Sequence, residues 1–164
     1  MERPTEFEEA APRLAGHADL GAVVGLTQDA YAPYTALLGS PPLPVTEDYA
    51  PRIAAGQVWL LRRDGGPAGL LVLERHPDHA MIYSVAIAPA RQGEGHGATL
   101  PRFAEVKASG WSVPELRLYT NARMERNIAI YRAAGYRETG RRQHPLRFSF
   151  TIVDMAKPLG PRGG

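Results

Sequence analysis

A short stretch rich in glycine, ARQGEGHGATL, is the part of the sequence whose residue types best suit chemistry. It covers Ala90–Leu100 and has glycine at every second position, at Gly93, Gly95 and Gly97. Glycine loses more conformational freedom on folding than any other residue, so this spacing indicates a backbone that a ligand approaches closely. A loop between a strand and a helix presents bare N–H groups and the positive end of the helix dipole, which bind anions. The stretch therefore predicts a phosphate-binding loop.

Several kinds of loop share this pattern. The spacing Gly93-x-Gly95-x-x-Ala98 fits the dinucleotide motif, in which the first glycine directly follows the first strand and an acidic residue ends the second strand. Here three predicted strands precede the loop, and Glu115 begins its strand instead of ending it. A Walker loop is excluded because no Gly-Lys-Ser or Gly-Lys-Thr follows. Taken alone, the loop also fits a plain turn that binds no ligand.

Hydrophobic spacing and turn residues predict the elements that position this loop. Strands are expected at Arg13–Ala15, Gln57–Arg63, Pro67–Glu74, Ala80–Ala88, Glu115–Thr120, Tyr136–Arg142 and Arg147–Met155. Helices are expected at Asp19–Leu38, Thr46–Gly56, Gly95–Ser109 and Met124–Ala134. Asp64-Gly65-Gly66 predicts a hairpin turn. Hairpins followed by a strand–helix–strand unit predict an α/β protein with one mixed sheet and helices on its faces.

The stretch Gly39–Val45 and the residues after it predict a loop followed by a helix start. Its three prolines lack N–H donors, so it is predicted to be a surface loop. Thr46 is predicted to be a helix N-cap, with Glu47 and Asp48 in an acidic first turn.

Proline and glycine also predict irregularities within the helices. Pro33 and Pro101 fall inside predicted helices, where the first is expected to allow a break and the second to cause a kink. Gly135 is expected to end the last helix in a left-handed conformation.

Composition limits the class of protein. The chain has 164 residues, 44% hydrophobic and 22% charged, which is typical of one soluble globular domain. No apolar run approaches the ~20 residues of a membrane-spanning helix, and the acidic N-terminus has no apolar signal core. The absence of cysteine excludes disulfides, thiolate metal sites and a cysteine nucleophile. The 17 arginines alternate with acidic residues, for a net charge of +2, so no stripe for nucleic acid is indicated. A cytoplasmic protein without metal, membrane or nucleic-acid partners is expected.

The loop and a second motif together resemble the GNAT acetyltransferase superfamily. The family's acyl-CoA segment reads Gln/Arg-x-x-Gly-x-Gly/Ala after a strand and a proline, as do Pro89, Gln92, Gly95 and Gly97. Its second half reads roughly LYTN..M..N..Y...GY.E. The matching residues here are Leu118, Tyr119, Thr120, Asn121, Met124, Asn127, Tyr131, Gly135, Tyr136 and Glu138.

The resemblance covers most of residues 13–158 and implies the GNAT fold. That fold has a mostly antiparallel mixed sheet with helices on both faces, and its strands splay apart at the CoA site. Residues 12–158 are therefore expected to form a single acetyltransferase domain, with a flexible lead-in at 1–11 and a disordered tail at 159–164.

The resemblance also implies an activity and a set of site residues. Acetyl-CoA would be the co-substrate, and the acetyl group would pass by direct attack to the primary amine of a small molecule or a peptide. Tyr131 matches the tyrosine that protonates the CoA thiolate, and Tyr31, Tyr34 and Tyr83 lie where family members shape the acceptor pocket. The expected cofactor contacts are Val85, Ala86, Ile87, Arg91, Gln92, Gly93, Gly95, His96, Gly97, Ala98 and Asn127. A homodimer is compatible with the resemblance.

The general base is one departure from the family pattern. Related sequences often carry glutamate on the central strand, where this chain has Tyr83 and Ser84. Glu74, His76, His79 and a water chain remain open as alternatives.

The glycine loop departs as well. Glu94 stands where lysine or arginine is common, and a carboxylate near pyrophosphate is unfavourable unless it points outward. His96 replaces a usual aliphatic residue, and Arg91 is expected to offset the lost charge. Two alternatives to an enzyme stay open. The missing glutamate allows a non-catalytic acyl-CoA-binding or regulatory module, and the arginine-rich surface allows a protein-interaction domain with an acidic partner.

Overall fold

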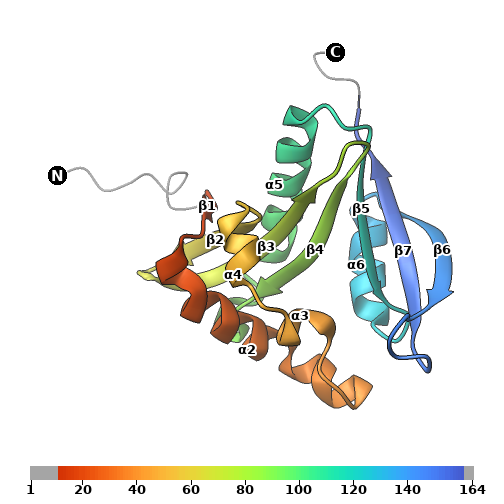
Figure 1. Ribbon diagram of the computed structural model, residues 1–164, viewed down its shortest axis with the longest axis horizontal. Helices are drawn as coiled ribbons and strands as arrows, with labels where there is room; N and C mark the ends of the chain where they lie inside the picture. Colours follow the sequence, from red (N-terminus) through yellow and green to blue (C-terminus); the bar gives the residue numbers. More distant parts are fainter. Residues whose placement is uncertain (1–10, 161–164) are drawn as a thin grey trace. The chain divides into compact units, whose positions relative to one another are not determined.

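The computed structural model describes residues 11–160, so the expected lead-in at 1–10 and the tail beyond residue 160 lie outside the described residues (Figure 1). Seven strands are hydrogen-bonded in the order β1-β2-β3-β4-β5-β7-β6. The β4–β5 pair is parallel, whereas β1–β2, β2–β3, β5–β7 and β6–β7 are antiparallel. The predicted α/β architecture with a mixed, mostly antiparallel sheet is confirmed.

The elements follow one another as the sequence predicts, with three additional short helical segments, at His17–Asp19, Leu43–Thr46 and Pro89–Arg91. The strands are β1 (Arg13–Leu14), β2 (Val58–Arg63), β3 (Gly66–Arg75), β4 (Ala80–Ile87), β5 (Glu115–Asn121), β6 (Arg137–Gln143) and β7 (Thr151–Pro158). The helices are η1 (His17–Asp19), α2 (Leu20–Leu38), α3 (Leu43–Thr46), α4 (Ala50–Ala54), η2 (Pro89–Arg91), α5 (His96–Gly110) and α6 (Glu125–Ala133). None of the helices within residues 11–160 is long and apolar enough to cross a membrane.

Backbone contacts group the described residues into two compact units. The first holds residues 11–73 and 84–103, and the second holds 74–83 and 104–160. Strands β3 and β4 and helix α5 contribute residues to both.

In the first unit, β3 is covered on both faces. Its residues Ala68–Leu73 are all buried, the pattern of a strand with helices on either side. Helices α2 and α4 lie over one face of β2 and β3, and the first turns of α5 lie over the other (Figure 1). A Cβ atom at Gly69 would come within 3.1 Å of the Leu100 side chain and 3.2 Å of the Ala86 carbonyl oxygen. Glycine at position 69 therefore lets α5 and β4 approach β3 closely.

The β2–β3 hairpin turns where the sequence predicts. Asp64 and Gly65 have φ angles of 53° and 77°, both positive, as a two-residue hairpin turn of the primed type requires. Arg63 and Gly66 face each other in the register on either side of it. Asp64 of this turn contacts the glycine loop through Arg91.

The prediction of a plain loop at Gly39–Val45 is wrong. Leu43–Thr46 forms the helical turn α3, and Pro44 is tolerated because the first turn of a helix needs no N–H donor. Thr46 is not an N-cap but ends this turn, and its hydroxyl donates to the Leu43 carbonyl (3.2 Å). The N-cap of α4 is Tyr49, which makes no side-chain cap bond, and Glu47 and Asp48 precede this helix instead of forming its first turn. Asp48 Oδ1 accepts the N–H of Ala50 at 3.2 Å.

The helices run through both internal prolines. Helix α2 continues past Pro33 and ends at Gly39, which is left-handed with φ 76°. Helix α5 likewise continues past Pro101. The break allowed at Pro33 does not occur, because the tertiary structure supports the helix beyond the single missing hydrogen bond.

In the second unit, β5, β7 and β6 lie side by side (Figure 1). Leu116 and Leu118 of β5 are buried, as are Ile128 of α6 and Val153 and Met155 of β7. These side chains form the apolar core of this unit.

The C-terminal end of α6 has two matched stabilising features. Gly135 has a φ of 100°, so the predicted left-handed glycine is confirmed. Lys157 Nζ donates to the Ala134 carbonyl (2.8 Å) and pairs with Glu105 Oε1 (2.6 Å). A cation there also complements the negative end of the helix dipole.

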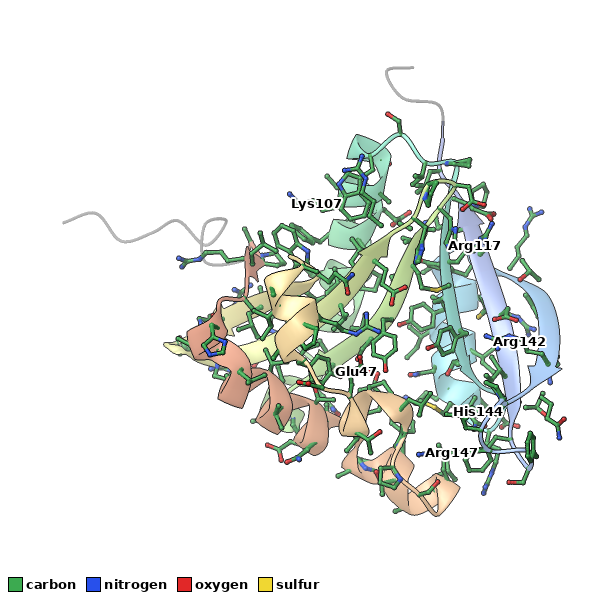
Figure 2. The ribbon with its side chains drawn as sticks, viewed as in Figure 1. Glu47, Lys107, Arg117, Arg142, His144 and Arg147 are labelled. Carbon is green, nitrogen blue, oxygen red and sulfur yellow. The ribbon has the colours of Figure 1, made fainter. Side chains whose placement is uncertain are left out.

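The last strand begins later than predicted. The prediction of a strand at Arg147–Met155 is wrong at both ends, since β7 covers Thr151–Pro158. Its start is displaced because residues 147–150 form a turn in which the Phe150 N–H bonds to the Arg147 carbonyl (2.9 Å). The buried His144 organises this turn: its Nδ1 accepts the N–H groups of Leu146 (3.1 Å) and Arg147 (3.0 Å). Figure 2 labels His144 and Arg147 at the β6–β7 connection.

The free energy of unfolding is expected to depend on pH through His144. Burial lowers the pKa of His144, and the nearby positive charges of Arg147 and Arg142 lower it further. Protonated Nδ1 could no longer accept its two N–H groups. As the pH falls, the unfolded chain, whose histidine pKa is about 6.5, binds a proton at a higher pH than the folded protein does. The contribution of neutral His144 to the free energy of unfolding is therefore complete above about pH 6.5 and decreases below it.

Denaturant titrations at pH 8 and pH 5.5 test this dependence. His144→Asn keeps an acceptor near the position of Nδ1 but does not titrate. Wild type should lose about 0.5–1 kcal/mol more than this variant between the two pH values. Equal losses in both proteins would contradict the role given to His144.

Candidate functional site

The glycine loop connects β4 to α5 and has the shape of an anion cradle. Gly93 and Gly95 have φ angles of 88° and 91°, which residues other than glycine adopt only with backbone strain. The N–H groups of Ala98 (3.2 Å) and Thr99 (3.1 Å) both bond to the Gly95 carbonyl. Within residues 11–160, the five N–H groups from Gly93 to Gly97 have no hydrogen-bond acceptor. A row of unpaired donors at a helix N-terminus fits a phosphate group.

The third glycine has a different role from the other two. Gly97 lies in the first turn of α5 and has no unusual backbone angle. A Cβ atom at Gly93, Gly95 or Gly97 would meet nothing within 4 Å among the described residues. The space over the loop is therefore open, and the absence of a side chain at Gly97 leaves room there for a ligand.

The structure explains the carboxylate in this loop. Glu94 Oε1 lies 3.0 Å from His96 Nε2, and Glu94 Oε2 lies 3.6 Å from Arg91 Nη1. Arg91 Nη2 also donates to Asp64 Oδ2 at 2.8 Å. The expected cofactor contacts Arg91 and His96 are thus both bonded to carboxylates. Sequence reasoning missed the Asp64 contact, which joins residues 27 positions apart without any local signal.

Strand β4 leads into this loop with the backbone expected to hold pantetheine. Val85 and Ile87 are half-buried and Ala86 is buried. The Val85 carbonyl accepts the Tyr31 hydroxyl at 3.4 Å, and the Ile87 carbonyl accepts Gln92 Nε2 at 3.5 Å. The Gln92 side chain is therefore folded back over the end of the strand.

A hydroxyl pair joins α2 to β4. The Tyr31 hydroxyl lies 3.0 Å from Ser84 Oγ, and Ser84 is 3% exposed. The Tyr34 ring lies 6.0 Å from the Tyr31 ring, so two of the three tyrosines expected at the acceptor pocket are neighbours. Tyr83 is half-buried on β4 and belongs to the second unit. Ser84 was not expected as a site residue, although it stands where family members often carry glutamate.

Removal of either hydroxyl of this pair is expected to reduce stability. Tyr31→Phe and Ser84→Ala should each lower the free energy of unfolding by about 1 kcal/mol, because each removes the hydrogen bond between the two hydroxyls. The double variant should lose less than the sum, since both changes remove the same bond. Denaturant titrations of the four proteins measure this coupling, and strictly additive losses would contradict a direct bond.

Asn127 and Tyr131 lie in the second unit, four residues apart on one face of α6. Both are half-buried. The Tyr131 ring meets the edge of the Tyr136 ring at a centroid distance of 5.4 Å and an interplanar angle of 73°. Burial raises the pKa of Tyr136, whose hydroxyl has no hydrogen-bond partner among the described residues. The ring of Tyr136 thus packs against the ring of Tyr131, and the Tyr136 N–H donates to the Tyr131 carbonyl at 3.0 Å.

The three candidates for a general base are bonded within their own turn. His76 Nε2 lies 2.8 Å from Glu74 Oε1, and His79 Nδ1 lies 2.7 Å from Asp78 Oδ1. The two imidazole rings stack at 4.5 Å. This turn precedes β4, whereas the glycine loop follows it.

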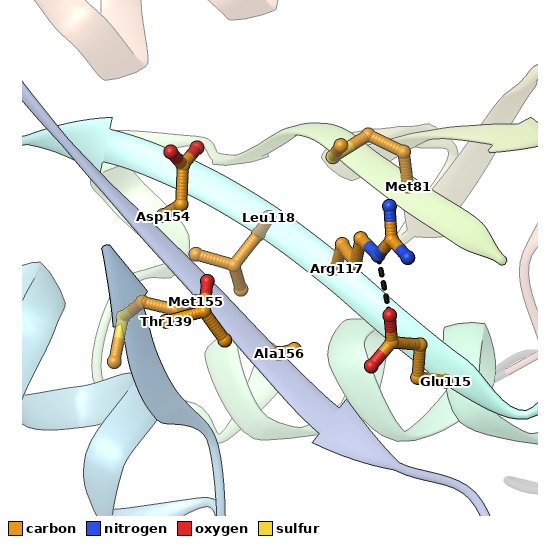
Figure 3. A pocket seen from close by; sticks show the side chains of 8 residues that line it. All are labelled: Met81, Glu115, Arg117, Leu118, Thr139, Asp154, Met155 and Ala156. Atoms are coloured by element: carbon orange, nitrogen blue, oxygen red, sulfur yellow. Dashed lines mark hydrogen bonds and ion pairs between the residues drawn. The ribbon is translucent and has the colours of Figure 1, made fainter. Parts of the chain in front are cut away.

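An open cavity of about 400 Å³ lies against the sheet of the second unit (Figure 3). It is lined by Met81, Glu115, Arg117, Leu118, Thr139, Asp154, Met155 and Ala156. Arg117 Nε donates to Glu115 at 2.5 Å, and Asp154 accepts two bonds from Arg142 at 2.9 and 3.2 Å. No group of three or more metal-binding side chains occurs within residues 11–160.

The open mixed sheet, with a glycine loop between its fourth strand and a helix, is the architecture of an N-acetyltransferase. The chain belongs to the Acetyltransferase (GNAT) family, whose sequence profile matches residues 23–136. It is thus an acyltransferase of this type, and the expected family is confirmed. No curated protein matches it.

Solved structures share the fold at low sequence identity. The ribosomal-protein-S18-alanine N-acetyltransferase from Escherichia coli is 22% identical with a TM-score of 0.72, over 93% of this chain and 96% of that one. The PaiA N-acetyltransferase from Thermoplasma acidophilum, in complex with coenzyme A, is 17% identical with a TM-score of 0.75, over 90% and 98%. The IAA acetyltransferase from Bacillus cereus is 19% identical with a TM-score of 0.65, over 91% and 99%.

Proposed function

We propose that this protein transfers an acetyl group from acetyl-CoA to a primary amine of a small molecule or a protein. The observation that carries the proposal is the glycine loop, with five unpaired N–H groups at the start of α5. The family to which the chain belongs uses acetyl-CoA, and the PaiA structure contains coenzyme A. The activated thioester of acetyl-CoA supplies the acetyl group.

The residues of the first unit are suited to hold the cofactor. The N–H groups of the loop from Gly93 to Gly97 face the pyrophosphate, while the Ala98 N–H stays bonded to the Gly95 carbonyl. The backbone of Val85, Ala86 and Ile87 holds the pantetheine arm. Asn127 of α6 supplies a further polar contact. We treat residues 12–158 as one domain, because β3, β4 and α5 run through both units and the family match spans both.

Tyr131 is the proposed general acid. Acetyl transfer forms a carbon–nitrogen bond and breaks the carbon–sulfur bond, so the leaving thiolate needs a proton, which the Tyr131 hydroxyl donates. An N–H of the Val85–Ile87 segment stabilises the oxyanion formed during attack. Water takes the proton of the amine, since Glu74, His76 and His79 are already bonded within their turn.

The acceptor pocket is assigned to Tyr31, Tyr34 and Tyr83. The neighbours differ in the acceptors that their names give, from a ribosomal protein alanine to IAA. We therefore assign this chain an amine acceptor as a class.

Calorimetry with CoA and a thiol-release assay over an amine panel test the proposed function. We expect CoA to bind and at least one amine to release CoA thiol from acetyl-CoA. Binding without turnover on any amine would favour a non-catalytic acyl-CoA-binding module. Absence of CoA binding would overturn the proposal and favour a protein-interaction domain.

A further inference from the structure

We propose that Arg91 is a positioning residue that, with Asp64, Glu94 and His96, forms a clasp holding the glycine loop in its phosphate-binding shape. The inference rests on the proposed function, since it concerns the loop to which we assign the CoA pyrophosphate. It assigns Arg91 a different role from the direct cofactor contact that the sequence suggests.

The guanidinium of Arg91 joins the loop to the β2–β3 hairpin. Its Nη2 donates to Asp64 Oδ2 at 2.8 Å and to the Arg63 carbonyl at 3.4 Å. Its Nη1 lies 3.6 Å from Glu94 Oε2. Two residues with positive φ fix the shape of the hairpin turn. The turn is thus a rigid anchor for the Arg91 side chain, which lies at the N-terminal side of the glycine loop.

Glu94 joins the two ends of the loop. One of its oxygens faces Arg91, and the other accepts from Nε2 of His96, whose side chain is 6% exposed at the start of α5. Glu94 lies between Gly93 and Gly95, the two residues with positive φ. The clasp therefore holds the chain on both sides of the two glycines with positive φ, and such preorganisation lowers the cost of binding a ligand.

The sign of a mutational effect separates the clasp from simple electrostatics. With neutral histidine, the two carboxylates and one guanidinium sum to a charge of −1. Coulomb's law alone predicts that removing a carboxylate beside the loop tightens the binding of an anion. If Arg91 were a phosphate ligand held back by Asp64, freeing it would also tighten binding. The clasp predicts weaker binding of CoA when either carboxylate, Asp64 or Glu94, is removed.

Titration of CoA into three carboxylate variants provides the test. Asp64→Asn is expected to raise the Kd for CoA about two- to fivefold, the scale of a partly exposed ion pair. Glu94→Ala is expected to raise it about five- to tenfold, since it loses the contacts to both Arg91 and His96. Asp29→Asn removes an exposed carboxylate from α2 and should leave the Kd unchanged.

A double-mutant cycle shows whether Asp64 acts through Arg91. In an Arg91→Met background, Asp64→Asn should have no further effect on the Kd, because its partner is gone. Unchanged or tighter binding in Asp64→Asn and Glu94→Ala would overturn the clasp while leaving the proposed function intact.

Hydrogen exchange in the free protein tests the clasp without the ligand. The N–H groups of Ala98 and Thr99 bond to the Gly95 carbonyl, so they report the shape of the loop. They should exchange faster in Glu94→Ala than in wild type or Asp29→Asn. Unaltered exchange in Glu94→Ala would overturn the clasp, whether or not the protein binds CoA. Failure of the wild-type protein to bind CoA would overturn only the proposed function.

Discussion

Replacing Tyr131 by phenylalanine is expected to lower kcat about 100-fold and to leave the Kd for CoA unchanged. The change removes a single oxygen, the proposed proton donor for the leaving thiolate. The ring stays, and with it the edge-on contact to Tyr136 that holds α6 residue 131 in place. Steady-state kinetics with an amine identified from the panel, together with calorimetry, measure the two quantities.

Tyr136→Phe is the matched control for this variant. It makes the same chemical change on the neighbouring ring, where the hydroxyl is buried without a partner among the described residues. Its removal should leave kcat unaltered and leave stability equal or slightly raised, because an unsatisfied buried hydroxyl costs free energy. Unaltered kcat in Tyr131→Phe would show that the proton comes from elsewhere.

Gly97→Ala is expected to stabilise the free protein and weaken CoA binding at the same time. Alanine favours a helix by about 0.5–1 kcal/mol over glycine, and the added methyl group meets nothing within 4 Å in the described structure. In the complex the same methyl group would keep a phosphate from the N–H groups of the loop. Loss of one charge-assisted hydrogen bond, about 1.5–3 kcal/mol, corresponds to roughly 10- to 100-fold in Kd.

Gly25→Ala separates the two effects. Gly25 lies inside α2, and a Cβ atom added there would likewise meet nothing within 4 Å among the described residues. This variant should stabilise the protein by a similar amount and leave the Kd for CoA unchanged. Thermal denaturation and calorimetry on both variants make the comparison. Tight CoA binding by Gly97→Ala would mean that the phosphate does not approach residue 97.

Local signals in the sequence predict the parts of this fold that local chemistry determines. Two positive φ values at Asp64 and Gly65 follow from their residue types, and so does the left-handed Gly135. The glycine loop falls between its strand and helix as expected. Each of these depends on the backbone freedom of one or two residues and needs no distant partner.

The predictions that are wrong concern the ends of helices and strands, and the contact that is missed joins residues far apart in the sequence. Thr46 suits an N-cap by its residue type, but it ends the helical turn at Leu43–Thr46, and α4 begins only at Ala50. The start of β7 moves because His144 binds the turn before it. The Asp64–Arg91 pair depends on how the hairpin packs beside the loop, which no pattern within either segment encodes.

The scarcity of lysine has a chemical consequence if the proposed acetylation of amines is this protein's reaction. Beside 17 arginines the chain has two lysines, Lys107 and Lys157. A guanidinium keeps its proton at neutral pH and is a poor nucleophile, so the arginine-rich surface offers few targets to the protein's own reaction. The Lys157 ammonium donates to the Ala134 carbonyl at 2.8 Å and pairs with Glu105 Oε1 at 2.6 Å, so both partners occupy its N–H groups. The same contacts that secure the end of α6 therefore shield one of the two lysine amines from self-acetylation.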